Sequence, residues 1–397
     1  MMIKNNLKLR TINNGGISFR FLETGDIYDV TYNDYQINLV KGNVMDGSLM
    51  NVYLRIKKDH GYISTPLIHK DILSGVSYLD HQVTYYGTFQ GITYQIDLVI
   101  GKYQWDLHVS LDSNQEMEVD LFYGQDVAIQ NKSSVLSSEA YTVQYIDYKV
   151  EQNKSGYVLS AKQNQGAPQF LQIGSYSKNI AYCTDGFQFF GNSYKLTQMP
   201  KALMEDQLQS VIKQYEFSYL TLQSEKVNLK KHASVSFYGY YKPEQYDADA
   251  IKIIDVQQLP FEKMTIDTPM KKSRFNHRTE LLNGNDLSEE KIDALFNVKR
   301  HTEKSNGKTL SFFTDNHHHV VLKEKEKLVE RPHGHLMVHG DLLHVSENVM
   351  ATTNFMFGVF GSHIVLGNTS FNKFLGDIRN PLNVQKISGQ RIYIKKD

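Results

Sequence analysis

Residues 94–121 read YQIDLVIGKYQWDLHVSLDSNQEMEVDL, and apolar and polar side chains alternate along three successive runs of this stretch. The runs cover residues 94–100, 105–111 and 117–121. A period of two residues is that of a β-strand, in which successive side chains point to opposite faces. We therefore expect strands of an antiparallel sheet, each with one apolar face on a core and one wet face.

The same alternation recurs over most of the first 240 residues, for example at 17–21 and 215–219. Turn signals such as Asn14-Gly15-Gly16 and Asp46-Gly47 separate the runs. The chain has 25 Tyr and 20 Phe but only 8 Pro, and aromatic rings favour strands because they pack well on a pleated surface. The pattern predicts an all-β, mainly antiparallel fold. It consists of a large β-sandwich, a partial second β domain and a few short helices.

The chain is predicted to divide into an N-terminal β-sandwich over 1–270, a linker over 271–309 and a second β-sandwich over 310–397. Alternation fades after Pro243, and Asp286 with Glu289 three residues later is typical of a helix start. One face of that helix would carry three apolar residues, Ile292, Leu295 and Phe296. Because the chain stops directly after an apparent strand, the second sandwich is expected to be truncated.

Composition excludes several classes of protein. The 43 basic and 43 acidic residues cancel, so there is no strong field to attract nucleic acid or an anionic membrane, whereas sugars remain possible partners. Cys183 is the single cysteine, which rules out an intrachain disulfide, and we interpret it as a small buried residue rather than a reactive thiol. No apolar stretch resembles a signal peptide or a membrane span, so we predict a cytoplasmic location.

Histidine is concentrated near the C-terminus, where seven of the 15 lie between His317 and His344. His333 and His335 could hold a metal on one strand face. Structural zinc sites usually recruit cysteine, however, and no His-Glu-x-x-His motif occurs. We therefore predict no metal site and place Arg331, His333 and His335 as structural residues between domains. Arg331 could alternatively clamp a phosphate, because guanidinium groups bind such anions with two hydrogen bonds.

The stretch from residue 123 to 145 is the most polar and aromatic part of the first domain. Aromatic rings stack on sugar C–H faces, and amides and carboxylates bond the hydroxyls. The candidate substrate contacts there are Gln125, Asp126, Tyr141, Gln144 and Tyr145. A glycosidase pair formed by Asp126 and Glu139 is a weaker alternative. No phosphate-binding glycine loop and no Gly-x-Ser-x-Gly elbow occurs, so no catalytic residue is predicted.

Longer strings carry a more specific signal, and they resemble glycoside hydrolase family 94. The strings are Gly124-Gln125-Asp126-Val127, Glu139-Ala140-Tyr141, Gln144-Tyr145-Ile146-Asp147, Thr184-Asp185-Gly186-Phe187-Gln188-Phe189-Phe190-Gly191, Glu330-Arg331-Pro332-His333-Gly334-His335, Gly367-Asn368-Thr369-Ser370-Phe371-Asn372-Lys373 and Ser388-Gly389-Gln390-Arg391. They run from the first domain to near the last residue. The resemblance implies a supersandwich similar to that of galactose mutarotases.

The resemblance also implies a chemistry. Enzymes of this family cleave β-linked glucans, including β-1,2-linked oligoglucans, with inorganic phosphate as co-substrate, and they release α-glucose 1-phosphate with inversion. They need no metal or cofactor, and their catalytic residues lie in an (α/α)6 barrel. The chain is therefore expected to be the non-catalytic front of such a phosphorylase, inactive without a catalytic-domain partner chain. A stand-alone carbohydrate-binding module that takes a β-linked gluco-oligosaccharide, or an inactive gene remnant, is the alternative.

Overall fold

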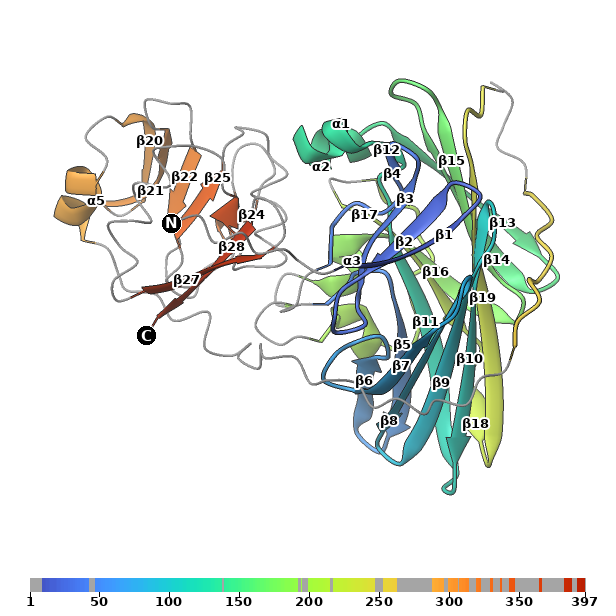
Figure 1. The fold of residues 1–397 in the computed structure, drawn as a ribbon. Helices are drawn as coiled ribbons and strands as arrows, with labels where there is room; N and C mark the ends of the chain where they lie inside the picture. The colour runs from blue at the N-terminus through green and yellow to red at the C-terminus, as the bar shows by residue number, and fades with distance from the viewer. Residues whose placement is uncertain are drawn as a thin grey trace. The chain divides into compact units, whose positions relative to one another are not determined.

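The computed structural model describes residues 9–42, 47–137, 139–191, 194, 199–214, 217–246, 253–262, 288–295, 299–305, 307–313, 319–322, 329–330, 336–337, 343–346, 364–365, 382–387 and 391–396. The chain forms two compact units. The first unit comprises 1–136, 142–191 and 199–274, and the second comprises 137–141, 192–198 and 275–397. Figure 1 shows both units as ribbons. The predicted domain limits remain a prediction, because residues 263–287 lie outside the described part.

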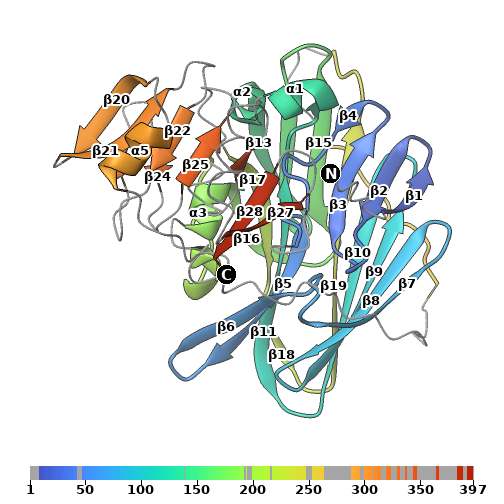
Figure 2. The same cartoon turned by 60° about the vertical axis from the view of Figure 1, so that its left-hand side comes forward.

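Three antiparallel sheets build the first unit (Figures 1 and 2). The N-terminal sheet has the order β1 (Arg10–Asn14), β2 (Ile17–Phe21), β3 (Ile27–Tyr32), β4 (Tyr35–Gln36) and β12 (Gln130–Asn131). The eight-stranded sheet has the order β13 (Ile146–Asn153), β14 (Gly156–Gln163), β15 (Gln169–Ser175), β19 (His232–Lys242), β10 (Gln104–Ser113), β9 (Ile92–Ile100), β8 (Gln82–Phe89) and β7 (Leu73–Tyr78). The six-stranded sheet has the order β16 (Asn179–Asp185), β17 (Ser218–Ser224), β11 (Met117–Asp126), β5 (Asn51–Lys58) and β6 (Gly61–Pro66), with β18 (Val227–Leu229) paired to β11.

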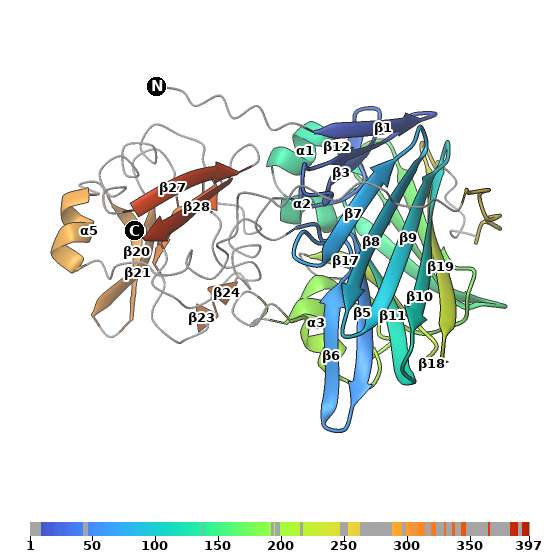
Figure 3. The ribbon, with the colours of Figure 1, turned by 60° about the horizontal axis from the view of Figure 1, so that its bottom comes forward.

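The core lies where the three sheets meet around Trp105 on β10. Its indole is fully buried and lies edge-on to Phe19 on β2, with ring centroids 5.7 Å apart. The strand opposite carries Gly239, and a Cβ there would lie 2.2 Å from the indole ring. Glycine at this position therefore makes room for the tryptophan. Figure 3 shows β7, β8, β9, β10 and β19 side by side. The alternating runs 94–100 and 105–111 are the neighbouring strands β9 and β10 of this sheet, whereas the run 117–121 lies on β11 of the six-stranded sheet.

One expectation about these strands is wrong: their polar faces are not all wet. Asp106 and His108 on β10 are at most 4 % exposed, although they point away from the apolar core. A segment without regular secondary structure, residues 253–262, lies over this face, and we call it the strap (Figure 1). Periodicity predicts the direction of a side chain but not what a distant segment lays over it.

Glutamine side chains hold the strap by bonding its backbone as a neighbouring strand would. Gln172 on β15 donates to the Ile254 carbonyl at 2.9 Å and accepts from the Ile254 N–H at 2.8 Å. Gln104 donates to the Gln257 carbonyl at 2.8 Å, and Gln82 on β8 donates to the Glu262 carbonyl at 2.8 Å. The Gln82 and Gln172 side chains are buried, and these bonds satisfy their amides, as a covered polar face requires.

The helices of the described residues are short. They are α1 (Lys132–Ser137), α2 (Glu139–Val143), α3 (Gly186–Phe190), the 3-10 helix η1 (Lys201–Met204) and α5 (Glu289–Leu295). Asp185 caps α3, because its carboxylate accepts from the Gln188 N–H at 2.8 Å. Among the described helices, none has the length and apolar character needed to cross a membrane.

The second unit also contains antiparallel strands. Its described sheets have the orders β20 (Arg300–Ser305), β21 (Lys308–Phe313), β22 (His319–Leu322) and β25 (Leu343–Ser346); β23 (Val329–Glu330) and β24 (Leu336–Met337); and β26 (Ile364–Val365), β28 (Arg391–Lys396) and β27 (Leu382–Ile387). Glu289 at the start of α5 accepts from the Thr309 N–H at 2.8 Å. Helix α5 and strand β20 thus occupy part of the predicted linker. The all-β, mainly antiparallel fold class is confirmed.

Candidate functional site

Gln125 and Asp126 end strand β11, and both are fully buried. Gln125 accepts from the Tyr123 hydroxyl at 3.0 Å, and its amide donates to the Asp126 carbonyl at 3.0 Å. The Asp126 carboxylate accepts from the Val40 N–H at 2.6 Å. The bond to Val40 ties β11 to the chain after β4. In this structure the pair lies inside the core, so its polar atoms support the fold rather than face solvent.

Tyr141, Gln144 and Tyr145 lie at and after helix α2, and all three are exposed. The Tyr145 carbonyl accepts from the Asn164 N–H at 2.9 Å, which fixes the backbone at the start of β13. Tyr141 belongs to the second unit, whereas Gln144 and Tyr145 belong to the first. The predicted contacts therefore separate into a buried pair and exposed residues, and sugar contact by the exposed residues remains a prediction.

Arg331, His333 and His335 lie outside the described residues. Within the described part of the chain, no three His, Cys, Asp or Glu residues are grouped as a metal site would require. Cys183 is fully buried, and burial raises the pKa of its thiol to about 12, which agrees with a structural role.

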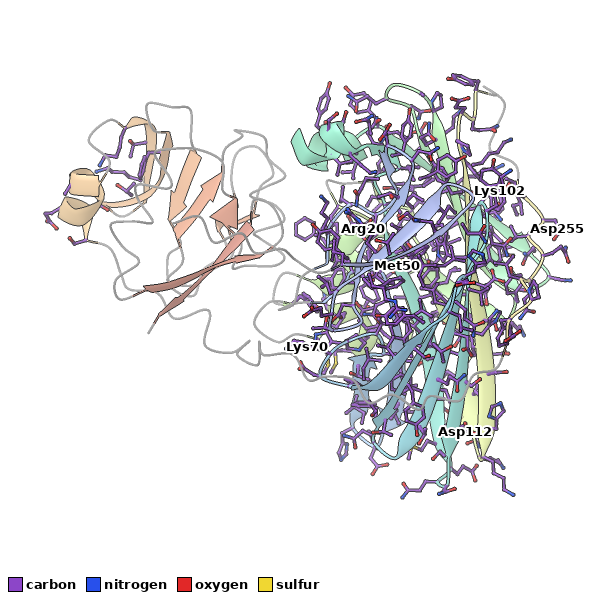
Figure 4. The ribbon with its side chains drawn as sticks, in the orientation of Figure 1. Arg20, Met50, Lys70, Lys102, Asp112 and Asp255 are labelled. Carbon is purple, nitrogen blue, oxygen red and sulfur yellow. The ribbon has the colours of Figure 1, made fainter. Side chains whose placement is uncertain are left out.

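A polar groove of about 460 Å³ lies on the outer side of the N-terminal sheet. We call it the N-terminal groove. Its lining is Asn13, Gly16, Ser18, Arg20, Thr31, Asn33 and Lys132. Figure 4 marks Arg20 on this sheet. The opposite face of the same strands carries Ile17, Phe19 and Phe21, which are fully buried. The alternation seen in the sequence therefore divides these strands into a core face and a groove face.

Strand register aligns the polar side chains in rows. Asn13 on β1 is paired with Ser18 on β2, which is paired with Thr31 on β3. Adjacent strands are about 4.8 Å apart, so this row presents one polar side chain per strand at that spacing. The turn at one end depends on Gly16, whose φ is +108° and where a Cβ would lie 2.7 Å from the Tyr32 ring.

An ion pair forms the second row. Arg20 on β2 is paired in register with Asp29 on β3. Its Nε donates to Oδ1 of Asp29 at 2.6 Å, and its Nη2 donates to Oδ2. Asp29 is fully buried, whereas the Arg20 side chain is 33 % exposed. Hydrogen bonding to this carboxylate raises the pKa of Arg20 above its usual range, so the cation is permanent and fixed in orientation.

The groove presents polar hydrogen-bonding groups, but its lining is not suited to acid–base chemistry. The lining side chains are amides, hydroxyls and two cations, and none of them is a carboxylate, an imidazole or a thiol. None of these residues was predicted from the sequence as a site residue. The available signal was the alternation of residues 17–21, in which Ser18 and Arg20 occupy the polar positions. Lys132 could not be found this way, because it comes from helix α1 more than a hundred residues along the chain.

Two family models match the chain. The SOGP N-terminal domain matches residues 20–239, and the glycoside phosphorylase supersandwich domain matches residues 296–397. A 1,2-beta-oligoglucan phosphorylase from Listeria innocua serovar 6a is 33 % identical over 401 residues, a match that covers 98 % of this chain and 36 % of that protein. The chain thus spans about a third of the length of this curated relative.

Solved structures show weaker similarity. A bacterial glucoamylase complexed with acarbose has 13 % identity and a TM-score of 0.37, covering 60 % of this chain and 32 % of that one. Galactose 1-epimerase from Lactobacillus acidophilus NCFM has 9 % identity and a TM-score of 0.33, covering 62 % of this chain and 98 % of that one. TM-scores at this level are too low to support an argument about function.

Proposed function

The chain belongs to the family marked by an SOGP N-terminal domain and a glycoside phosphorylase supersandwich domain, and from this premise we propose that it is the N-terminal, non-catalytic part of an inverting 1,2-β-oligoglucan phosphorylase. The observation that supports this most directly is the similarity to one such phosphorylase over 98 % of this chain but only 36 % of the relative. Membership of glycoside hydrolase family 94 is part of the same proposal.

In the proposed reaction, an oxygen of inorganic phosphate attacks the anomeric carbon of the terminal glucose. The glycosidic C–O bond breaks, and a carboxylic acid protonates the departing oxygen of the shortened glucan. The products are α-glucose 1-phosphate and an oligosaccharide one residue shorter. We place this acid in an (α/α)6 barrel, within the part of the relative's length that this chain does not span.

The carboxyl groups of the first unit fit a supporting role. Among the described residues, burial raises the pKa values of Asp26, Asp106 and Asp185, which is a property that a general acid needs. All three side chains are at most 1 % exposed, and none lines the N-terminal groove. Their raised pKa values therefore reflect interior packing, which supports the proposal that the acid comes from elsewhere.

An assay of reconstituted activity tests the proposal. The chain alone is incubated with β-1,2-linked gluco-oligosaccharides and phosphate, and release of α-glucose 1-phosphate is measured. The same assay is run after mixing or co-expression with the remaining part of a 1,2-β-oligoglucan phosphorylase, beginning after its region similar to residue 397. We expect turnover only in the mixture. Turnover by this chain alone, or a well-folded mixture without turnover, would contradict the proposal.

A stand-alone carbohydrate-binding module is the second candidate function, and the N-terminal groove is the observation that favours it. The two candidates differ in their dependence on a catalytic partner. A binding module retains its sugar affinity alone and contributes nothing to turnover in the mixture.

A further inference from the structure

We propose that the N-terminal groove is a binding site for a neutral gluco-oligosaccharide. The identity of the sugar rests on the proposed function, whereas the existence of the site rests on the geometry of β1, β2 and β3. Such a site would hold the glucan on the first unit, apart from the position at which the bond is broken.

The side chains on the groove floor have hydrogen-bonding capacity to offer. Among the described residues, the side chains of Asn13, Ser18, Thr31 and Asn33 make no hydrogen bond to protein groups. Together they supply two amides and two hydroxyls, each of which both donates and accepts. Sugar hydroxyls likewise donate and accept, so they match this mixed set better than a ligand with acceptors only.

The groove floor is rigid before any ligand arrives. Each of β1, β2 and β3 is bonded to its neighbour, and the inward residues Ile17, Phe19 and Val30 are fully buried. Asn33 is fixed at the rim, because its N–H donates to the Gly16 carbonyl at 3.1 Å and its carbonyl accepts from the Lys132 ammonium. A preformed polar surface loses little conformational entropy on binding, which favours recognition.

Charge argues against phosphate as the main ligand. An arginine binds phosphate most strongly through its two-pronged edge, but Nε and Nη2 of Arg20 are already bonded to Asp29. The Asp29 carboxylate also offsets the guanidinium charge, which leaves Lys132 as the remaining cation of the lining. A neutral ligand therefore suits the site better than an anion.

The lining also sets the expected strength of binding. No aromatic residue belongs to the lining of this groove, so a sugar ring gains little stacking energy there. We expect a Kd on the order of 1 mM for an oligosaccharide, because polar contacts largely replace bonds to water. The volume of about 460 Å³ falls within the range of ligand sites, about 300–1,000 Å³.

Titration of the purified chain tests the site. Calorimetry or ligand-observed NMR is carried out with a β-1,2-linked glucotriose and, separately, with inorganic phosphate. The groove variant is the double substitution Asn13→Ala with Ser18→Ala, which removes polar groups from two adjacent strands. Its matched control is Ser74→Ala with Thr88→Ala, two exposed polar residues on neighbouring strands β7 and β8. Thermal unfolding confirms that both variants are folded.

We expect saturable sugar binding that the groove variant weakens at least tenfold and the control leaves within twofold. Absence of sugar binding up to 20 mM, equal binding by the groove variant, or phosphate binding that displaces the sugar would each overturn the inference. The reconstitution assay separates the two proposals. Glucose 1-phosphate release without groove binding overturns only this inference, whereas groove binding with an inactive mixture overturns only the proposed function.

Discussion

The indole N–H of Trp105 donates to the hydroxyl of Tyr123 at 2.8 Å, which links the eight-stranded sheet to the six-stranded sheet inside the core. The Tyr123 hydroxyl in turn donates to Gln125 at 3.0 Å. Both rings are fully buried. A single hydroxyl therefore satisfies one polar group in each of two sheets.

Replacing Tyr123 with phenylalanine should destabilise the first unit by about 1–3 kcal/mol, because the Trp105 N–H and the Gln125 carbonyl would then be buried without this partner. The measurement is urea unfolding at neutral pH. Tyr86→Phe is the matched control, since its ring is 36 % exposed, and it should change the free energy of unfolding by less than about 0.5 kcal/mol. Equal effects of the two substitutions would show that the hydrogen bonds of the Tyr123 hydroxyl contribute nothing to the free energy of unfolding.

A second prediction concerns two ion pairs on the same two strands. Arg55 on β5 bonds Asp120 on β11 through Nε at 2.8 Å and Nη2 at 2.6 Å, and both side chains are at most 3 % exposed. Asp120→Ala should cost about 3–5 kcal/mol, because it leaves the buried guanidinium without its countercharge. The free energy of unfolding measures this cost.

The neighbouring pair supplies the control. Lys57 and Glu118 are 3.3 Å apart, and their side chains are 53 % and 41 % exposed. Glu118→Ala should cost about 0–1 kcal/mol, since water already screens the two charges. If Glu118→Ala costs as much as Asp120→Ala, burial is not what makes the Arg55 pair important.

The third prediction concerns pH and the strap. Burial lowers the pKa of His108 to about 4, although Asp106 Oδ2 lies 3.9 Å from its Nε2 and favours the charged form. The ring is stacked on Phe261 of the strap and contacts Gln258, and burial outweighs the distant carboxylate. The unfolded chain binds this proton near pH 6.5. Between about pH 6.5 and 4 the unfolded state therefore holds more protons, and acidification destabilises the fold.

The contribution of His108 to the free energy of unfolding should fall by on the order of 2–3 kcal/mol between pH 7 and pH 4. Urea unfolding at a series of pH values measures this fall. His108→Gln cannot titrate, so its loss of stability over this range should be smaller than that of the original chain. If the free energy of unfolding falls equally with pH in the two proteins, the loss of stability does not come from His108.

Asp26 should act in the opposite direction. Its carboxyl is fully buried, it accepts from the Thr24 hydroxyl at 2.6 Å, and burial raises its pKa to about 7 in spite of nearby Lys70. Because the folded state holds this proton more tightly than the unfolded state, stability from this group is lost as the pH rises from about 4 to 7. Asp26→Asn should therefore gain stability relative to the original chain over that interval, by at most on the order of 3 kcal/mol.

The free energies of unfolding of Asp26→Asn and of the original chain are compared at pH 5 and pH 8. If the difference in favour of Asp26→Asn does not grow with pH, the prediction is wrong. Ser74→Ala is the control. Ser74 is exposed and its hydroxyl does not ionise in this interval, so the effect of the substitution on the free energy of unfolding should not change with pH.

The local sequence predicted which side of each strand faces the core. Ile17, Phe19 and Phe21 are buried as the alternation indicated, and the same pattern placed Ser18 and Arg20 opposite them. These directions follow from the two-residue period of a strand, which needs no knowledge of distant contacts. The helix at Glu289–Leu295 was also predictable from its capping signal, although Asp286 lies outside the described residues.

The candidate site was predicted less well. Gln125 and Asp126 were selected for their chemistry, but the core encloses them. Gln144 and Tyr145 are exposed, and their contact with sugar remains a prediction. Lys132 was missed because nothing near it in the sequence indicates that it lines a groove with Ser18.

By itself, the sequence determined the all-β class, the family and the inward direction of the strands, because these depend on local periodicity and on long ordered strings. Only the tertiary structure decided which polar faces stay wet. Asp120 is buried because Arg55 lies beside it, and His108 is buried because the strap covers it. Such outcomes depend on segments far apart along the chain, which are brought together by the burial of apolar surface and whose pairing no local pattern encodes.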